Sequence, residues 1–504
     1  MSWRGIRARA LPALAVGAVV LGASALPGPA PALAAGGSCT GWGRPAVAAD
    51  PHLHALRVFA IQFEQQPARM ASASGYERAI DCAIRTEVLP HLARGRANLV
   101  VFDEDVGLET IAIGPRGTSA RALLRNGVPS CAGQPPCFTL ATLSAINGGY
   151  GTALSYLGPA YPKLGSQLGR GFVAATDEFA RVFMTTMATE ARRYGLYVIA
   201  SNTQAPFRVT RDPAAITALA DPGAPRPRAV YAPTAGVAYD QTFVWGPRLV
   251  HRGAPAPLAN LIADNYKVPL TGFEQALGFA AGPSRGAAAR RNLRPIRIPG
   301  TGARLGLATS LPAFQYGRRV PGHACDDVAL TYMRCLDQLG ANVLIQADAN
   351  DGEWTGPDGS GKERWQPLSW MGSAYRAVSD PSVGFTYAVN PFMVGNLADT
   401  PFDGQSAILQ RGLRGQPGRG CHYIGNGSFV PGQDLPLYRA DAGSKAQFLA
   451  LAPWVRSGSR TRLRRVGTAL AAGTGGYRYV QTAVIADLPF PADRTRSGCV
   501  PAGR

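Results

Sequence analysis

The chain has 504 residues, of which 46% are hydrophobic, so it can bury a large core and is not a wholly disordered protein. Its 51 Lys and Arg residues outnumber 32 Asp and Glu residues, which gives a formal net charge of +19. The excess is almost all Arg and accompanies abundant Ala, Gly and Pro, a pattern typical of coding bias rather than of nucleic-acid binding. The same composition excludes collagens, coiled coils and multi-span membrane proteins.

The first 34 residues have the pattern of a secretory signal peptide. Arg4, Arg7 and Arg9 precede an apolar run at 11–26, and a small-residue A-x-A site ends at Ala34. We therefore expect cleavage after Ala34 and a secreted, soluble protein, outside the cell or in the cell envelope; an uncleaved membrane anchor is the alternative. Cleavage lowers the net charge from +19 to +16, which favours contact with anionic surfaces of the cell envelope.

The eight cysteines all follow the predicted cleavage site, and an even number in an oxidising compartment predicts disulfides. Two pairs are close in sequence, so we predict the local bridges Cys131–Cys137 and Cys325–Cys335. The remaining cysteines would make two further bridges, whose connectivity stays open: Cys39, Cys82, Cys421 and Cys499. Neither the cysteines nor the six histidines have the spacing of metal ligands, so we expect no metal and no cofactor.

Strands and helices are predicted to alternate along most of the chain, which indicates an α/β fold. Short apolar runs predict strands at 56–62, 98–102, 196–200, 237–245, 305–309, 342–346, 383–389 and 485–488. Helical periodicity predicts helices at 77–88, 175–194, 328–339 and 370–378. Glycine, proline or arginine enrichment predicts loops or insertions at 114–170, 204–229, 285–297 and 456–465.

Polar residues of three chemical types stand where α/β enzymes place their sites, at strand ends. Glu104 and Ser310 each follow an apolar strand, and Lys267 lies seven residues before Glu274. A carboxylate, an ammonium and a hydroxyl could serve as base, oxyanion stabiliser and nucleophile. Taken singly, each is more often an ordinary surface residue.

Three segments in chain order resemble the nitrilase, or carbon–nitrogen hydrolase, superfamily. Residues 99–104 read LVVFDE and are similar to the family's L-V-V-F-P-E, with Asp103 in place of the Pro. Residues 266–269 read YKVP and look like its K-x-x-P-like segment. Residues 306–310 read GLATS and look like its G-x-A-x-C strand, with Ser310 in place of the Cys. Further similar segments lie at 58–62, 240–247, 340–345, 350–352, 390–391, 404–406 and 485–488.

The resemblance covers residues 56–490 and implies a fold, a four-layer α-β-β-α sandwich in one domain. Insertions near 114–170 and 204–229 would shape its pocket. The domain would follow a signal peptide at 1–34 and a linker at 35–55, and a tail at 491–504 would end the chain. Oligomeric state is left open, including a homo-oligomer.

The resemblance also implies roles for four residues. In the family a Cys thiolate attacks an amide or nitrile carbon, a Glu takes its proton, a Lys stabilises the oxyanion, and many members use a second Glu. Those positions correspond here to Ser310, Glu104, Lys267 and Glu274. The implied activity is hydrolysis of a non-peptide amide or nitrile bond in a small molecule, and no nucleic acid is an expected partner.

Ser310 is the main departure from this pattern, because a hydroxyl is a far weaker nucleophile than a thiol and needs a strong base. No His lies near it in sequence, so Lys267 would have to act as that base, if burial lowered its pKa. One alternative is a displaced thiol from Cys325 or Cys335. Others are an inactive binding protein, or an extracellular acyl transferase similar to the apolipoprotein N-acyltransferase branch.

Overall fold

The computed structural model describes residues 39–49, 55–67, 70–131, 136–317, 323–352, 354, 366–412, 447–453, 479–494 and 500–501. The chain divides into two compact units, residues 1–40 and 41–504. All elements described below belong to the second unit. The predicted signal peptide and the loop predicted at 456–465 lie outside the described residues.

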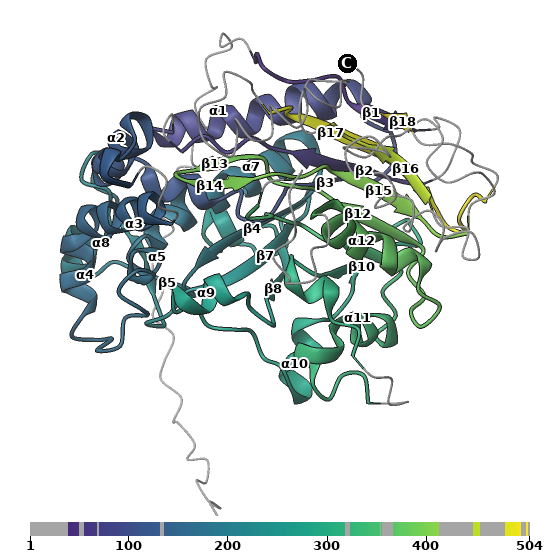
Figure 1. The fold of residues 1–504 in the computed structure, drawn as a ribbon. Coiled ribbons are helices and arrows are strands. Elements are labelled where there is room, and N and C mark those ends of the chain that lie inside the picture. Colours follow the sequence, from purple (N-terminus) through teal and green to yellow (C-terminus); the bar gives the residue numbers. More distant parts are fainter. Residues whose placement is uncertain are drawn as a thin grey trace, which may run out of the picture. The chain divides into compact units, whose positions relative to one another are not determined.

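The first of two seven-stranded sheets contains both the earliest and the last long strand of this unit (Figure 1). Its strands, in spatial order, are β1 (Ala46–Ala48), β17 (Thr482–Pro489), β2 (Ala55–Gln62), β3 (Asn98–Val101), β4 (Tyr197–Gln204), β7 (Tyr239–Trp245) and β8 (Leu261–Tyr266). Strands β2, β3 and β4 run parallel, β7 runs antiparallel to β4, and β8 runs antiparallel to β7. Strand β8 therefore points in the same direction as β3.

The second seven-stranded sheet is formed by the later part of the chain. Its strands, in spatial order, are β18 (Val500–Pro501), β16 (Gln447–Leu451), β15 (Ala407–Gln410), β12 (Tyr387–Asn390), β11 (Val343–Ile345), β10 (Arg304–Leu307) and β9 (Ile296–Arg297). Strands β10, β11 and β12 run parallel. Two small hairpins pair β5 (Phe207–Thr210) with β6 (Val230–Pro233) and β13 (Gly395–Leu397) with β14 (Thr400–Phe402).

Helices connect most of these strands. The α-helices are α1 (Ala73–Ala83), α2 (Thr118–Asn126), α3 (Cys137–Gly149), α4 (Gly151–Leu157), α5 (Arg170–Ala174), α6 (Thr176–Glu178), α7 (Thr185–Tyr194), α8 (Pro213–Leu219), α9 (Gly272–Ala276), α10 (Gly286–Asn292), α11 (Val328–Gln338) and α12 (Gln366–Ser379). Two π-helical turns are η1 (Ile84–Val88) and η6 (Phe179–Met184). The 3₁₀ turns are η2 (Leu89–His91), η3 (Leu108–Ala112), η4 (Pro115–Gly117), η5 (Pro129–Cys131), η7 (Ala256–Leu258) and η8 (Leu311–Phe314).

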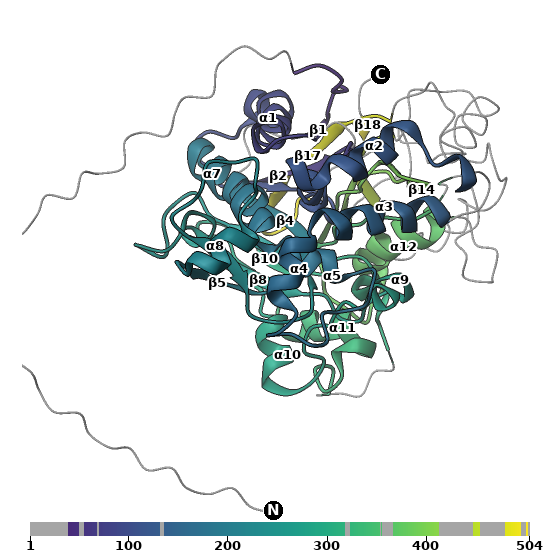
Figure 2. The ribbon, with the colours of Figure 1, turned by 90° about the vertical axis from the view of Figure 1, so that its left-hand side faces the viewer.

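Alternate side chains of the buried strands enter different cores, as the two-residue period of a strand requires. In β2, Val58 packs into a cluster that includes Leu305 and Val343 of the second sheet. Its neighbour Phe59 packs into another cluster with residues of α1 and α7, which lie side by side (Figure 2). A third cluster joins the second sheet to α11 and α12. The chain is thus an α/β protein with several sheets.

Two segments that the sequence predicts as loops contain regular structure, which corrects that interpretation. Residues 204–229 contain β5 and α8, and residues 285–297 contain α10 and β9. Residues 114–170, predicted as an insertion, contain α2, α3 and α4 and contribute to a core cluster. The loop prediction failed at α8 because proline was read as a helix breaker. Here Asp212 caps the helix and Pro213 occupies its first turn, where proline is favoured.

Both predicted local disulfides are present. Cys131–Cys137 and Cys325–Cys335 have Cα–Cα distances of 5.2 and 4.8 Å. Each therefore closes a short loop, as the sequence spacing implies. Of the cysteines with open connectivity, Cys39 and Cys82 are disulfide-bonded. Cys421 and Cys499 lie outside the described residues.

A buried ion pair joins the first and last long strands of the first sheet. Arg57 of β2 lies opposite Asp487 of β17, and its guanidinium donates two hydrogen bonds, of 2.9 and 2.7 Å, to the carboxylate. The Arg96 guanidinium lies 3.8 Å from the same carboxylate. The pair therefore ties together two strands that are 430 residues apart in sequence.

We expect Asp487→Ala to lower the free energy of unfolding by about 3–5 kcal/mol, because Arg57 would stay buried without its partner. Urea unfolding at neutral pH measures this loss. The control is the double variant Arg57→Leu and Asp487→Leu, which removes both charges and should lose much less. A single variant that loses less than about 1 kcal/mol contradicts the role of the pair.

Candidate active site

The ends of several strands meet where the candidate residues lie. Glu104 follows β3 and Lys267 directly follows β8; these two strands point in the same direction, so both residues lie at one edge of the first sheet. Ser310 follows β10 of the second sheet. Two contacts join the sheets near these residues. The Ala349 backbone, after β11, donates a hydrogen bond of 2.8 Å to Glu104. The hydroxyls of Thr242, in β7, and Thr309, after β10, lie 2.5 Å apart.

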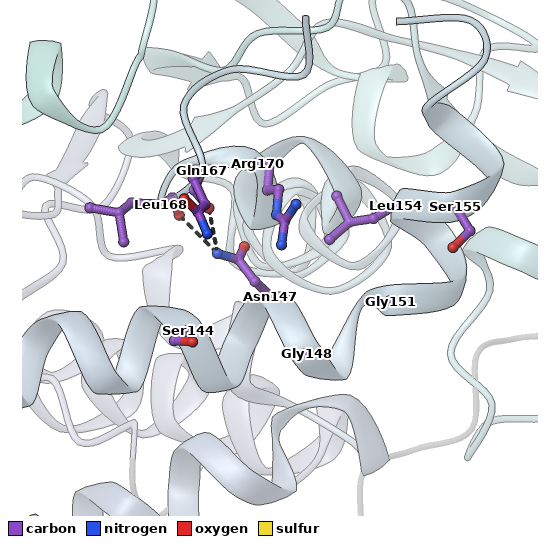
Figure 3. Close-up of a pocket in the computed structure, with 9 residues that line it drawn as sticks. All are labelled: Ser144, Asn147, Gly148, Gly151, Leu154, Ser155, Gln167, Leu168 and Arg170. Carbon is purple, nitrogen blue, oxygen red and sulfur yellow. Dashed lines mark hydrogen bonds between the residues drawn. The ribbon is translucent and has the colours of Figure 1, made fainter. Parts of the chain in front are cut away.

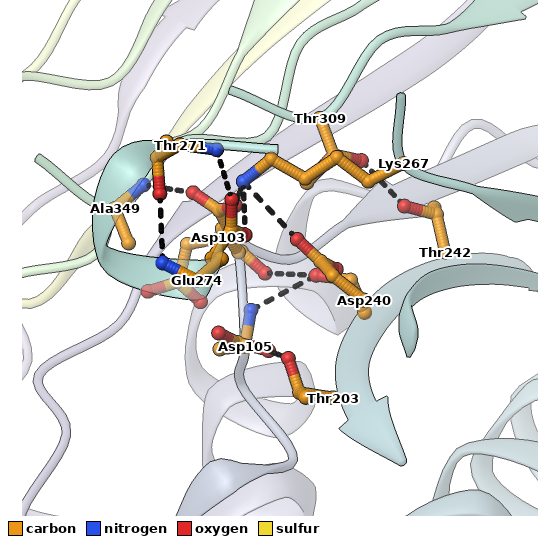
Figure 4. A network of polar contacts seen from close by, with 12 residues as sticks. Asp103, Asp105, Thr203, Asp240, Thr242, Lys267, Thr271, Glu274, Thr309 and Ala349 are labelled. Atoms are coloured by element: carbon orange, nitrogen blue, oxygen red, sulfur yellow. Dashed lines mark hydrogen bonds and ion pairs between the residues drawn. The ribbon is translucent and has the colours of Figure 1, made fainter. Parts of the chain in front are cut away.

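Lys267 is the centre of the site (Figure 4). Its side chain is 3% exposed, and its Nζ atom lies 2.5 Å from Glu104 Oε1, 2.6 Å from Glu274 Oε1 and 3.2 Å from Asp240 Oδ2. Lys267 therefore contacts both of the predicted carboxylates, Glu104 and Glu274. A third carboxylate, which the sequence did not single out, completes the set.

The electrostatic surroundings keep Lys267 charged. Burial by itself favours the neutral amine, but Glu104, Glu274 and Asp240 outweigh it and hold the pKa of Lys267 well above its usual value. The idea that burial lowers the pKa of Lys267 and makes it a base is therefore wrong in direction. A permanently charged ammonium can instead stabilise a developing negative charge.

Glu274 holds Lys267 in place. It is the third residue of α9, where it forms a capping box with Thr271: its Oε2 accepts a 2.6 Å hydrogen bond from the Thr271 backbone, and the Thr271 hydroxyl caps the helix in return. Burial raises the pKa of Glu274, but Lys267 and Thr271 more than offset this, and the net pKa is lowered. Glu274 is therefore ionised and serves as the fixed counter-ion.

Glu104 differs from Glu274 although both contact the same ammonium. It is 3% exposed, and burial raises its pKa to about 8, against the opposing effect of Lys267. Its Oε2 also accepts the hydrogen bond from Ala349. Each carboxylate oxygen has a second lone pair, so Glu104 can still accept a proton. It is a stronger base than an ordinary carboxylate.

Ser310 stands on a strained turn between β10 and η8. Its φ of 59° and ψ of −122° are rare for a residue with a side chain, and such strain is found at functional sites. In α/β-hydrolases a strained strand-to-helix turn presents the nucleophilic serine. The Ser310 backbone donates a 2.9 Å hydrogen bond to Ala347. Among the described residues its hydroxyl has no hydrogen-bond partner.

The structure brings three of the four predicted residues together: Lys267 directly contacts both Glu104 and Glu274. Ser310 is linked to them through the segment after β11, since Ala347 accepts its N–H and Ala349 donates to Glu104. Ser310 is itself buried, at 2% exposed.

The two cysteines considered as displaced nucleophiles are excluded. Cys325 and Cys335 are 1% and 0% exposed and form a disulfide with each other. Neither has a thiol that could ionise, and a thiolate is the nucleophilic form of cysteine. Ser310 is therefore the remaining candidate among those that the sequence indicates.

Sequence reasoning missed Asp240 and Asp105. Asp240 lies at the start of β7, and because β7 is antiparallel to β4, this start lies at the edge where β3 and β8 end. Sequence reasoning that considers only the residues after each strand overlooks Asp240, which lies near the start of one. The signal in the sequence was an Asp within a segment predicted to be a buried strand. Asp105 has a φ of 56°, and burial followed by the Asp240 charge raises its pKa to about 8.

The carboxylate oxygens of Glu104, Asp240 and Glu274 lie within 4.8 Å of one another, close enough to hold a metal ion. The Lys267 ammonium already contacts all three. Because it supplies the positive charge at their centre, this arrangement fits an internal cation better than a bound one.

A separate cavity of about 470 Å³ lies among α3, α4 and α5, in the segment predicted as an insertion (Figure 3). Asn147 spans part of it and donates hydrogen bonds to the backbone of Gln167 and Leu168. The Arg170 side chain also lines it. None of the site residues described above contributes to its lining.

Among the described residues, no helix is both long enough and apolar enough to span a membrane. The apolar run at 11–26, which raised the alternative of a membrane anchor, lies outside the described residues.

No protein-family model matches the sequence, and no curated protein sequence matches it. Solved structures do match. The amidase from Nesterenkonia sp. has a TM-score of 0.36 and 13% identity, over 71% of this chain and 83% of that chain. The carbon–nitrogen hydrolase from Helicobacter pylori G27 has a TM-score of 0.38 and 13% identity, over 71% of this chain and 83% of that chain.

In structure, the chain is similar to amidases of the nitrilase superfamily. A mutant of the amidase from Nesterenkonia sp. AN1 in complex with butyramide has a TM-score of 0.37 and 13% identity, over 72% of this chain and 85% of that chain. Another mutant of that amidase carries acrylamide at its active-site cysteine.

We expect Lys267→Met to lower the free energy of unfolding by about 3–5 kcal/mol at about pH 9, because ionised carboxylates would be buried without their cation. The loss should be smaller at about pH 5. In the variant, loss of the ammonium raises the pKa values of the surrounding carboxyls in the folded state. The variant is therefore stable at low pH, where these carboxyls are protonated, and loses stability as the pH rises and they ionise. Thermal unfolding at both pH values measures this. Lys163→Met, at an exposed lysine, is the control and should change little.

Proposed function

We propose that the protein is a secreted hydrolase of the carbon–nitrogen hydrolase type that cleaves a non-peptide amide or nitrile bond in a small molecule. Ser310 is the nucleophile, Glu104 the general base and Lys267 the oxyanion stabiliser, while Glu274 holds Lys267. The observation that carries this proposal is a charged, buried Lys267 in direct contact with a carboxyl whose pKa is about 8. The strained Ser310 is linked to that carboxyl through residues 347–349.

For an amide, the reaction divides into two transfers. The Ser310 hydroxyl attacks the carbonyl carbon, Glu104 takes its proton, and the Lys267 ammonium faces the oxygen that becomes negative. Glu104 then returns the proton to the departing nitrogen, and an acyl ester of Ser310 remains. Water, activated by Glu104 in the same way, attacks this ester and releases the acid and the serine hydroxyl.

The raised pKa of Glu104 compensates in part for the replacement of the usual thiol by a hydroxyl. A hydroxyl gives up its proton less readily than a thiol, so its base must be stronger. Burial raises the pKa of Glu104 to about 8 and so supplies a stronger base than a solvated carboxylate. No histidine is needed for this assignment.

We also propose the four-layer α-β-β-α arrangement in one domain over 56–490, with the signal peptide removed. The cluster shared by Val58, Leu305 and Val343 supports two sheets packed face to face. Helices α1 and α7 on one sheet, and α11 and α12 on the other, support the outer layers. The disulfides support secretion, because they persist in oxidising compartments.

A binding protein without turnover is the second candidate. It is favoured by the Ser310 hydroxyl, which has no hydrogen-bond partner among the described residues, whereas an activated nucleophile usually contacts its base. In that case the charged Lys267 would bind the carbonyl oxygen of a ligand that is never cleaved. An acyl transferase would share the acyl-Ser310 intermediate and differ only in its acceptor.

We expect mass spectrometry to detect an acyl adduct on Ser310 after incubation with a panel of small amides, nitriles and esters. Ser310→Ala should remove the adduct, and Ser310→Cys should form it faster because a thiol has a lower pKa, about 8.5. Release of free acid in water identifies a hydrolase, and transfer to an added lipid amine identifies a transferase. No adduct in either the wild type or Ser310→Cys favours the binding protein.

The rate should depend on the ionisation of Glu104. Since only the ionised form accepts a proton, we expect kcat/KM to rise as the pH rises through about 8, the pKa of this carboxyl. Glu104→Gln should lower kcat by about 100-fold or more at about pH 9, where wild-type Glu104 is ionised, because an amide cannot take the proton. A wild-type profile that is flat between about pH 6 and 9 contradicts this role.

A further inference from the structure

Asp240 adds a third carboxyl group to the two predicted glutamates around Lys267. It is 1% exposed, and its Oδ2 lies 3.2 Å from Lys267 Nζ. Figure 4 shows Asp240 and Glu274 on the Lys267 ammonium. Glu104 is the third carboxyl group that faces this one positive charge. If all three were ionised, a net charge of two would be buried without compensation, which is strongly unfavourable.

The closeness of Asp240 to Glu104 indicates how the cluster avoids this cost. A carboxyl oxygen of each lies within 4.8 Å of the other, and both groups are buried. Two ionised carboxylates this close repel each other, and a proton on one of them removes the repulsion. The cluster then contains two negative charges and one positive charge.

The donors around each carboxyl decide which one carries the proton. Glu104 accepts hydrogen bonds from Lys267 at 2.5 Å and from the Ala349 backbone, and Glu274 accepts them from Lys267 and the Thr271 backbone. Asp240 has only the Lys267 ammonium, at 3.2 Å from its Oδ2, and no backbone donor among the described residues. Donors stabilise the ionised form, so the proton belongs on the carboxyl that has the fewest and most distant donors.

We propose that Asp240 is a positioning residue that keeps its proton while Glu104 is ionised, and that its O–H donates a hydrogen bond to the Glu104 carboxylate. Burial, the largest influence on Asp240, raises the pKa of its carboxyl well above the usual value, in agreement with this geometry. The other groups that face it are Asp105, whose pKa is also raised, and the buried hydroxyl-bearing Tyr332 of α11.

The consequence for catalysis rests on the proposed function, whereas the protonation itself does not. Asp240 would give ionised Glu104 a third donor besides Lys267 and Ala349, and so would fix the orientation of the base. It would not exchange protons with the substrate: in the proposed reaction Glu104 alone takes the serine proton and returns it to the leaving group. Asp240 enters and leaves each cycle as the neutral acid.

Infrared difference spectroscopy tests the protonation without any substrate. At about pH 9, above the pKa of about 8 of Glu104, the spectrum of the wild type minus that of Asp240→Asn should contain the C=O band of a protonated carboxylic acid. Glu274→Gln is the matched control, because Glu274 is ionised. Its difference spectrum should contain a lost carboxylate band instead. A lost carboxylate band in the Asp240→Asn spectrum overturns the proposal.

The folding of the variant is part of the test. Asparagine has the shape of a neutral aspartic acid and leaves the charge of the cluster unchanged, so Asp240→Asn should fold at neutral pH with a melting temperature close to that of the wild type. Failure to fold contradicts the proposal as directly as the wrong infrared band does, because a neutral group would then not satisfy the site.

Kinetics test the positioning role where turnover is detected. Asp240→Asn should keep kcat within about tenfold of the wild type, since its amide can still donate to Glu104. Asp240→Ala removes the donor and should move the midpoint of the pH profile above about 8, because the ionised base loses a stabilising contact. Equal midpoints for the Asn and Ala variants overturn the positioning role. If no turnover is detected, the proposed function is contradicted, whereas the infrared test of the protonation of Asp240 keeps its meaning.

Discussion

The site depends on one buried ammonium group. Lys267 is nearly inaccessible to solvent, and its charge persists because Glu104 and Glu274 lie within 2.6 Å of it and Asp240 within 3.2 Å offers a further oxygen to its ammonium. These carboxyls come from three different parts of the chain: the segment after β3, the first turn of α9 and the start of β7. Because breaking a buried pair is costly, the ammonium also holds these segments together.

Lys267 contacts two glutamates, and the pKa values of these two residues shift in opposite directions. Glu274 receives a backbone hydrogen bond and an ammonium contact, and its pKa is lowered. Burial raises the pKa of Glu104 to about 8 although it contacts the same ammonium. Two carboxyls with opposite shifts are the arrangement that separates a structural counter-ion from a base. The assignment of roles follows from these environments rather than from residue type.

The proposed nucleophile and the proposed base are carried by different sheets. Ser310 follows a strand of the second sheet and Glu104 a strand of the first, and the contacts Thr242–Thr309 and Ala349–Glu104 cross between the sheets. The strained backbone of Ser310 is supported by its hydrogen bond to Ala347. Strain of this kind persists only where the surrounding structure imposes it. Packing of the sheets is therefore a condition for the proposed chemistry as well as for stability.

Much of the architecture follows from local sequence patterns. The apolar runs at 56–62, 98–102 and 485–488 are strands, and the two closely spaced cysteine pairs are disulfides. These features need only neighbouring residues, since burial of a strand or closure of a short loop is decided locally. The loop interpretation failed at 204–229 because proline both breaks helices and starts them, and composition does not distinguish the two.

By itself the sequence determined that Glu104, Lys267, Glu274 and Ser310 are the candidates, because each has a recognisable place in a motif or after a strand. Only the tertiary structure decided that Lys267 is charged, that Asp240 belongs to the cluster and that Ser310 is strained. Charge states depend on burial and on partners such as Glu104, which is 163 residues from Lys267. Asp240 enters the site because β7 is antiparallel, and strand direction is settled only when the sheet forms.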